Sequence, residues 1–71
     1  MEICRRAGAN IQRLRKDRGW SQEELADRAG LHRTYISAVE RGVQNVTIVA
    51  LEKIVKALDV SFGAVLDPGR S

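Results

Sequence analysis

The chain has 71 residues, a single cysteine and a formal net charge of +3, and 44% of its residues are hydrophobic. One domain over residues 1–71 is therefore expected, with a core too small to enclose a sizeable substrate cavity. One cysteine cannot form an intramolecular disulfide, no apolar run reaches the ~18 residues of a membrane span, and no apolar signal segment follows Arg5 and Arg6, so the chain is interpreted as cytoplasmic.

The first expected helix covers residues 3–18 and carries most of the positive charge. Ala7, Ile11 and Leu14 recur at spacings of four and three, which gives one apolar stripe among basic residues. Residues 1–18 hold six basic and two acidic side chains, whereas the remainder holds six basic and seven acidic ones. This asymmetry favours a polyanionic partner, with phosphates as the leading candidate. An ordinary solvated helix face is the alternative that charge alone leaves open.

The second expected helix has a clearly marked start. Gly19 suits the end of the helix before it, and Ser21 suits the cap of the new one. Glu24, three residues after Ser21, completes a capping box. Trp20 is expected to pack against Leu25 as a hydrophobic staple, in the core rather than as a platform for stacked bases.

A tight turn joins this helix to a third one, and the two form a candidate helix-turn-helix over about residues 21–42. Ala26 is small enough for a close contact between helices, and Gly30 tolerates the positive φ of a sharp turn. The segment from His32 to Arg41 would extend about 15 Å as a helix, enough to lie in the major groove of DNA. In such units the second helix presents its N-terminal residues to the base edges.

Two further helices complete the pattern. Thr47 suits the cap of a helix over residues 48–58, and Ser61 that of a short helix from 62 to about 66, which ends before Pro68. Apolar residues at helical spacing are expected to face inward from the longer of the two: Ile48, Leu51, Ile54, Val55 and Leu58. No alternation with a period of two appears, so the predicted fold class is all-α, with five helices.

The spacing of these residues resembles the Cro/cI-type (XRE) family of helix-turn-helix regulators. The motifs that carry the resemblance are Gln22-Glu23-Glu24-Leu25-Ala26, Gly30, Ile36, Glu40-Arg41-Gly42 and Leu51-x2-Ile54-x3-Leu58-x-Val60, over about residues 9–67. The resemblance implies a compact five-helix, lambda-repressor-like domain that binds operator DNA as a homodimer. The Arg33-Thr34-Tyr35-Ile36 string is most similar to short stand-alone members, including restriction–modification controller proteins. Val46 departs from the proline that many members have after the asparagine, which leaves the third loop less rigid.

Candidate base contacts lie at the start of the third helix and one turn further on. Arg33 can pair with O6 and N7 of guanine, and Thr34 can meet a thymine methyl or a base edge. Ser37 and Ala38 follow one turn later, where Ala38 offers only an apolar contact. The alternatives for the first two are an arginine that touches only phosphate and a solvated threonine.

Candidate phosphate contacts surround this helix. The resemblance implies that Gln22, at the start of the second helix, contacts a phosphate and braces a side chain of the recognition helix. Side chains in the loops beside a recognition helix also commonly meet phosphates. The full set of candidates is Gln22, His32, Tyr35, Arg41, Gln44 and Asn45, with Arg13 and Arg18 from the first helix. Tyr35 is equally suited to packing at the helix edge, and Glu40 is expected to face inward or to pair locally.

These observations predict a sequence-specific DNA-binding transcriptional regulator whose partner is a double-stranded operator. No Gly-rich phosphate loop, second histidine or nucleophile elbow is present, so no catalysis, metal site, cofactor or small-molecule substrate is expected. A homodimer would read a partly palindromic site, joined through a region at about residues 46–67 with Val46, Ala64, Val65 and Leu66 in the interface. The alternative is a protein-interaction module, such as an antitoxin-like partner with secondary DNA binding, which a large apolar patch over Phe62–Leu66 would favour.

Overall fold

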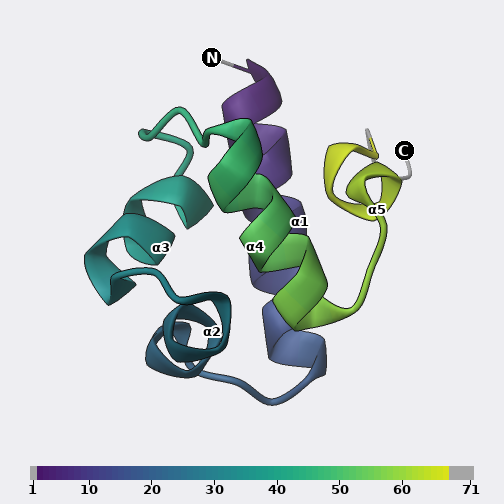
Figure 1. Cartoon of the computed structure of the whole chain (residues 1–71). Helices are drawn as coiled ribbons and strands as arrows, with labels where there is room; N and C mark the ends of the chain where they lie inside the picture. The colour runs from purple at the N-terminus through teal and green to yellow at the C-terminus, as the bar shows by residue number, and fades with distance from the viewer. Residues whose placement is uncertain (1, 68–71) are drawn as a thin grey trace.

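The computed structural model describes residues 2–67, which form five helices joined by short loops (Figure 1). The helices are α1 (Glu2–Asp17), α2 (Gln22–Ala29), α3 (Arg33–Glu40), α4 (Ile48–Leu58) and α5 (Phe62–Leu66). No strand occurs in this part of the chain, so the predicted all-α class is confirmed. Pro68, which was expected to follow the last helix, lies outside the described residues. No helix in residues 2–67 is long and apolar enough to cross a membrane.

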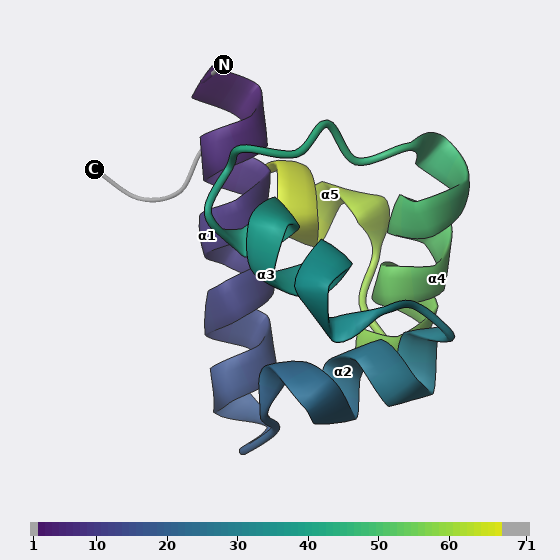
Figure 2. The same ribbon diagram turned by 90° about the vertical axis from the view of Figure 1, so that its left-hand side faces the viewer.

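The helices surround one core. α1 and α4 lie on opposite sides of it, α3 and α5 occupy the other two sides, and α2 crosses beneath them (Figures 1 and 2). α1 packs against α3 and α5, while α2 packs against α3 and α4. Every helix contributes at least one fully buried side chain, and the largest of these are Ile11, Leu25, Ile36, Val39, Ile54, Leu58 and Val65. The recognition helix of the predicted helix-turn-helix is therefore a wall of the core itself.

Three helices start at the predicted side-chain caps. The hydroxyl oxygens of Ser21, Thr47 and Ser61 each accept a hydrogen bond from the backbone N–H three residues later, at 3.0, 3.0 and 3.3 Å. The capping box at α2 is only half formed, which corrects the sequence prediction. The carboxylate of Glu24 accepts a 2.6 Å bond from Arg28 one turn on, because a charged donor competes better than the backbone N–H of Ser21.

The turn between α2 and α3 depends on a left-handed residue. Gly30 has φ +69°, and the chain reverses there with the Leu31 N–H bonded to the Ala26 carbonyl at 2.9 Å. A residue with a Cβ adopts this conformation at a cost, which is why a glycine serves best at this point. The sequence prediction of a sharp turn at Gly30 is confirmed.

The burial of two residues differs from the sequence prediction. Ile48, expected to face inward, is 74% exposed because it opens α4 at the edge of the molecule, where no other helix covers it. Val65, expected in a dimer interface, is 0% exposed because α5 folds back onto α1. The Asn10 side chain fixes this return by donating to the carbonyl oxygens of Val65 and Asp67, at 2.6 and 2.8 Å.

α1 and the end of α3 approach each other closely at Gly8. A Cβ at this position would collide with the carbonyl oxygen of Val39 and lie 2.8 Å from that of Glu40. Only a residue without a side chain permits this contact between a helix surface and the backbone of the recognition helix.

We expect Gly8→Ala to lower the free energy of unfolding by about 1–3 kcal/mol, despite the higher helix propensity of alanine, because neither backbone can yield without separating α1 from α3. Urea denaturation followed by circular dichroism measures the loss. Gly63→Ala is the matched control, since its methyl group would meet only the Ser61 hydroxyl at 3.6 Å. That control should leave stability unchanged or raise it by up to ~1 kcal/mol. Equal losses in the two variants would contradict the close approach at Gly8.

Candidate nucleic-acid interface

The candidate interface is built on α2 and α3, which pack against each other across small side chains. Ala26 and Ala29 of α2 are both buried, and α2 packs closely against α3. On α3, Ile36 and Val39 point into the core and fix the rotation of the helix about its axis. The opposite side of α3 is left facing outward, as a helix that reads DNA requires.

A buried ion pair joins α3 to α1. The Arg15 Nε donates to Glu40 Oε2 at 2.7 Å, and the Arg15 Nη2 donates to Glu40 Oε1 at 3.0 Å. The two side chains are only 8% and 1% exposed, so the pair is shielded from water and salt. Its two parallel bonds match the planar guanidinium to the planar carboxylate, the geometry that makes such pairs strong and directional.

The ion pair extends into a network that reaches α2. Arg15 Nη1 donates to the carbonyl oxygen of Trp20, just before α2, at 2.7 Å. Gln22 Nε2 donates to Glu40 Oε1 at 3.1 Å. Glu40 thus faces inward as predicted, but its partners come from two other helices rather than from its own. Arg15 is accordingly not part of an exposed basic face, which corrects its place in the charge count of the first helix.

The four residues predicted to contact bases lie on the outer side of α3. Arg33 and Thr34 are exposed in the first turn, and Ser37 and Ala38 are half-buried one turn on. Among residues 2–67, the Arg33 side chain has no hydrogen bond or ion pair, so its guanidinium is available to an external acceptor. The geometry therefore brings these four side chains together on one helix surface.

Four of the residues predicted to contact phosphates lie immediately before and after α3. Arg41, Gln44 and Asn45 are exposed in the loop after α3, and His32 is exposed just before it. Asn45 is anchored from outside its own loop, because its Oδ1 accepts a 3.0 Å hydrogen bond from the thiol of Cys4 in α1. Sequence reasoning assigned no contact to this cysteine.

The two arginines of the first helix that were predicted to contact phosphates, Arg13 and Arg18, both contact other side chains of the protein. Arg13 donates to the side-chain oxygen of Asn10 at 3.3 Å, and Arg18 lies 5.3 Å from the centre of the Trp20 ring. Arg28 covers the same ring at 4.3 Å. Trp20 packs against the core between them, as predicted, and is no free platform for a base.

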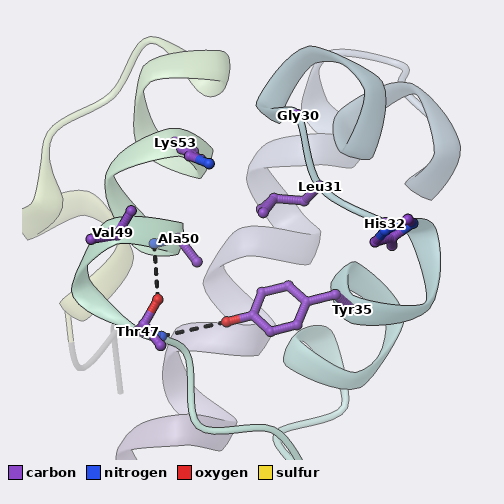
Figure 3. A pocket seen from close by; sticks show the side chains of 8 residues that line it. All are labelled: Gly30, Leu31, His32, Tyr35, Thr47, Val49, Ala50 and Lys53. Carbon is purple, nitrogen blue, oxygen red and sulfur yellow. Dashed lines mark hydrogen bonds between the residues drawn. The ribbon is translucent and has the colours of Figure 1, made fainter.

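Tyr35 spans the space between α3 and the start of α4 (Figure 3). Its hydroxyl accepts a long hydrogen bond of 3.4 Å from the backbone N–H of Thr47. The ring forms one wall of a hollow of about 350 Å³, whose other walls include Leu31, Ala50 and Lys53. In the protein alone, Tyr35 therefore packs at the edge of its helix, one of the two roles predicted for it.

Comparison with known proteins identifies the family. Residues 11–65 match the helix-turn-helix family HTH_3. The chain belongs to this family. The XRE-type fold predicted from the sequence is thereby confirmed.

Relatives of the HTH_3 domain include regulators with solved structures. The chain is 42% identical over 66 residues to the control protein C.SmaI of Serratia marcescens, over 93% of this chain and 79% of that protein. The restriction–modification controller protein C.AhdI from Aeromonas hydrophila has a TM-score of 0.88 at 37% identity, over 92% of this chain and 98% of that one. SinR, solved in complex with DNA, has a TM-score of 0.81 at 44% identity, over 86% and 98%. In the sequence comparison with the transcriptional regulator SinR from Bacillus subtilis, the match spans 84% of this chain but only 55% of that protein, at 44% identity. The predicted class of DNA-binding transcriptional regulator is confirmed at this level.

Sequence reasoning missed the ion pair between Arg15 and Glu40 that joins α1 to α3 inside the HTH_3 domain. Arg15 follows the buried Ile11 by four residues, and Glu40 follows the buried Ile36 by the same interval. Side chains four residues apart share a helix face, so both charged groups occupy core-facing positions. This spacing is the signal in the sequence that could have marked both charges as core-facing.

Glu40→Ala should lower the free energy of unfolding by about 3–5 kcal/mol, because it leaves the Arg15 guanidinium buried without its counter-ion. Glu52→Ala is the matched control, since Glu52 pairs with Lys56 at 3.8 Å on the exposed side of α4. Loss of that exposed pair should change stability by no more than ~1 kcal/mol. Thermal and urea unfolding of both variants measure the difference. A loss for Glu40→Ala as small as that for Glu52→Ala would contradict the role assigned to the buried pair.

Proposed function

We propose that this chain is a transcriptional regulator that binds a partly palindromic operator as a homodimer, with α3 in the major groove. The observation that carries the proposal is the first turn of α3, where Arg33 and Thr34 are exposed while the other side of the helix is locked into the core. A reading helix held in this way docks without a prior conformational change, so little ordering is required on binding. Such a regulator acts where the DNA lies, and we propose the cytoplasm as its location.

Arg33 is the proposed reader of guanine. Its free guanidinium can donate two parallel hydrogen bonds to O6 and N7, an arrangement that no other base offers. Thr34 supports it with a methyl or hydroxyl contact at a neighbouring base. Ser37 and Ala38, one turn on and half-buried, allow the groove floor to come close to α3.

Backbone contacts on both sides of α3 fix its register in this proposal. Gln22 lies at the start of α2, where unpaired backbone N–H groups also favour a phosphate. Asn45, with Arg41 and Gln44 beside it, lies in the loop at the far end of α3. The Cys4 thiol leaves the NH₂ end of the Asn45 amide free to donate, because it occupies only the oxygen.

The proposed dimer face lies at the N-terminal ends of α1 and α4, beside α5. Ile3, Ile48 and Leu66 are 46%, 74% and 40% exposed, and they border a hollow of about 390 Å³ that Val46 also lines. Contiguous apolar side chains of this kind mark a contact surface. Val46 and Leu66 of the predicted interface line this hollow, and the half-buried Ala64 of α5 stays part of the proposal. Val65 is left out of it because its side chain lies in the core.

The proposal is tested by selecting bound duplexes from a random DNA pool. The expected consensus has two inverted half-sites whose centres are about one helical turn apart. Sedimentation of the selected complex should then give two protein chains per duplex. A single asymmetric half-site bound by a monomer would contradict the dimer, and a pool without enrichment would contradict DNA reading and favour a protein-interaction module.

On the selected duplex, Arg33→Ala should weaken binding by about 1–3 kcal/mol and relax the preference at one base pair of each half-site. Arg33→Lys is the matched control, because it keeps the charge but loses the planar fork that pairs with guanine. Its affinity for unrelated DNA should match that of the wild type, while the base preference is lost. If both variants weaken all sequences equally or not at all, Arg33 does not read a base.

A further inference from the structure

The loop between α3 and α4 rests on the first turns of α1 (Figure 2). A Cβ at Gly42 would collide with the side chain of Arg5 and lie 2.7 Å from its Cα, so the loop backbone lies directly against this residue. Three residues later, Asn45 accepts the hydrogen bond from Cys4, the neighbour of Arg5. The loop is thus held on α1 at two points, and Arg5 lies at the first of them.

Arg5 lies on the flank of α1 that borders α3. Gly8 and Arg15, seven residues apart, both face α3 directly. Arg5 precedes Gly8 by three residues and therefore projects from nearly the same side of the helix. Ile3, which belongs to the proposed dimer face, is two residues from Arg5 and projects from a different side. Arg5 therefore lies at the edge of the surface formed by α3 and its loop, outside the dimer face.

The guanidinium of Arg5 has no strong partner among residues 2–67. Its one ion pair there is with Glu2, at 3.9 Å between Nη2 and Oε1, and both side chains are more than two-thirds exposed. An exposed pair at this distance contributes little to stability. An external anion can therefore replace the carboxylate of Glu2 at small cost.

A second arginine flanks the same glycine. Arg41 directly precedes Gly42, and its Nε donates only a long bond of 3.4 Å to a carbonyl oxygen of α3. Cationic side chains from two helices thus border one short loop. The sequence has no acidic residue between Glu40 and Glu52, and Glu40 is buried in its own ion pair. Because like charges repel each other, this concentration of positive charge beside Arg5 favours an anionic ligand.

We propose that Arg5 contacts the DNA backbone, at a phosphate next to those bound by the loop around Asn45. This inference rests on the proposed function and extends the interface from the helix-turn-helix to α1. Phosphate is the anion that the DNA presents beside the groove in which α3 lies, and a guanidinium can give it two parallel hydrogen bonds. Such a contact fixes the register of the protein on the duplex without reading a base.

The variants Arg5→Gln and Lys56→Gln remove one positive charge at two different places. The two side chains are 70% and 76% exposed, and each makes one long ion pair with a glutamate of its own helix, at 3.9 and 3.8 Å. Lys56 lies on α4, across the core from α1 (Figure 1). Glutamine keeps the Cβ and Cγ that rest on Gly42, so both variants are expected to fold as the wild type does.

The first measurement is the affinity for the selected duplex over a range of salt concentrations. Arg5→Gln should weaken binding by the dimer about tenfold, the scale of two exposed ion pairs. The slope of log K against log salt concentration should become shallower by about 1.8, because two phosphate contacts are lost at ~0.9 each. The base preference should stay as in the wild type. Lys56→Gln should leave the affinity, the slope and the preference unchanged.

The second measurement locates the contact with a single methylphosphonate placed at each phosphate in turn. At one phosphate per half-site, this change should weaken the wild type and Lys56→Gln but not Arg5→Gln. The same scan with Asn45→Ala identifies the phosphates bound by the loop. The phosphate assigned to Arg5 should lie directly beside them on the duplex.

The outcomes separate this inference from the proposed function. Equal effects of Arg5→Gln and Lys56→Gln on affinity and slope would overturn the contact, although the chain would still read DNA. A changed base preference in Arg5→Gln would also overturn it, because Arg5 would then read a base. The salt slope is equally measurable on a duplex of random sequence, so Arg5 is tested even if selection yields no consensus. If the protein binds neither duplex, both the inference and the proposed function are wrong.

Discussion

The structure depends on one buried interaction, the ion pair between Arg15 and Glu40. Removing two charges from water costs several kcal/mol per ion, so such a pair stabilises a protein only when its remaining hydrogen-bonding capacity is also satisfied. Arg15 here makes three hydrogen bonds, and Glu40 accepts three, counting the one from Gln22. No buried side-chain nitrogen or oxygen in residues 2–67 is left without a partner. The network therefore fixes α1, the start of α2 and the end of α3 in a single arrangement.

A domain this small must use the same helix for its core and for its function. α3 buries Ile36 and Val39 on one side and exposes Arg33 and Thr34 on the other. Gly8 allows α1 to press directly against the backbone at the end of this helix. The same contacts therefore stabilise the core and fix the direction in which Arg33 and Thr34 point. The helices need no separate scaffold to hold the proposed base-contacting side chains outward.

Local sequence patterns predicted most of the fold because they depend on neighbouring residues. Hydroxyl caps at Ser21, Thr47 and Ser61 and the turn at Gly30 act within a few residues, and each lies where it was expected. Ile48 was misplaced because periodicity describes the face of a helix but not where its neighbours end. The same limit applied to Val65, whose burial depends on how α5 folds back onto α1.

Part of the candidate interface was also predictable from local sequence patterns. The outward positions of Arg33 and Thr34 follow from the start of α3 and its inward apolar residues. The link from Arg15 to Glu40 crosses 25 residues of sequence and joins helices whose relative placement only the folded chain defines. Periodicity could flag each charge as core-facing, but it could not show that the two meet, or that Gln22 joins them.

The central claim is that this network makes α1, α2 and α3 one cooperative unit. Native-state hydrogen exchange tests it most directly through the backbone amides of Ile11, Leu25 and Ile36, one in the middle of each helix. The account predicts that all three exchange only by global unfolding, with the same free energy. Exchange of Ile36 through an opening of much lower energy, while Ile11 and Leu25 keep the global value, would contradict it.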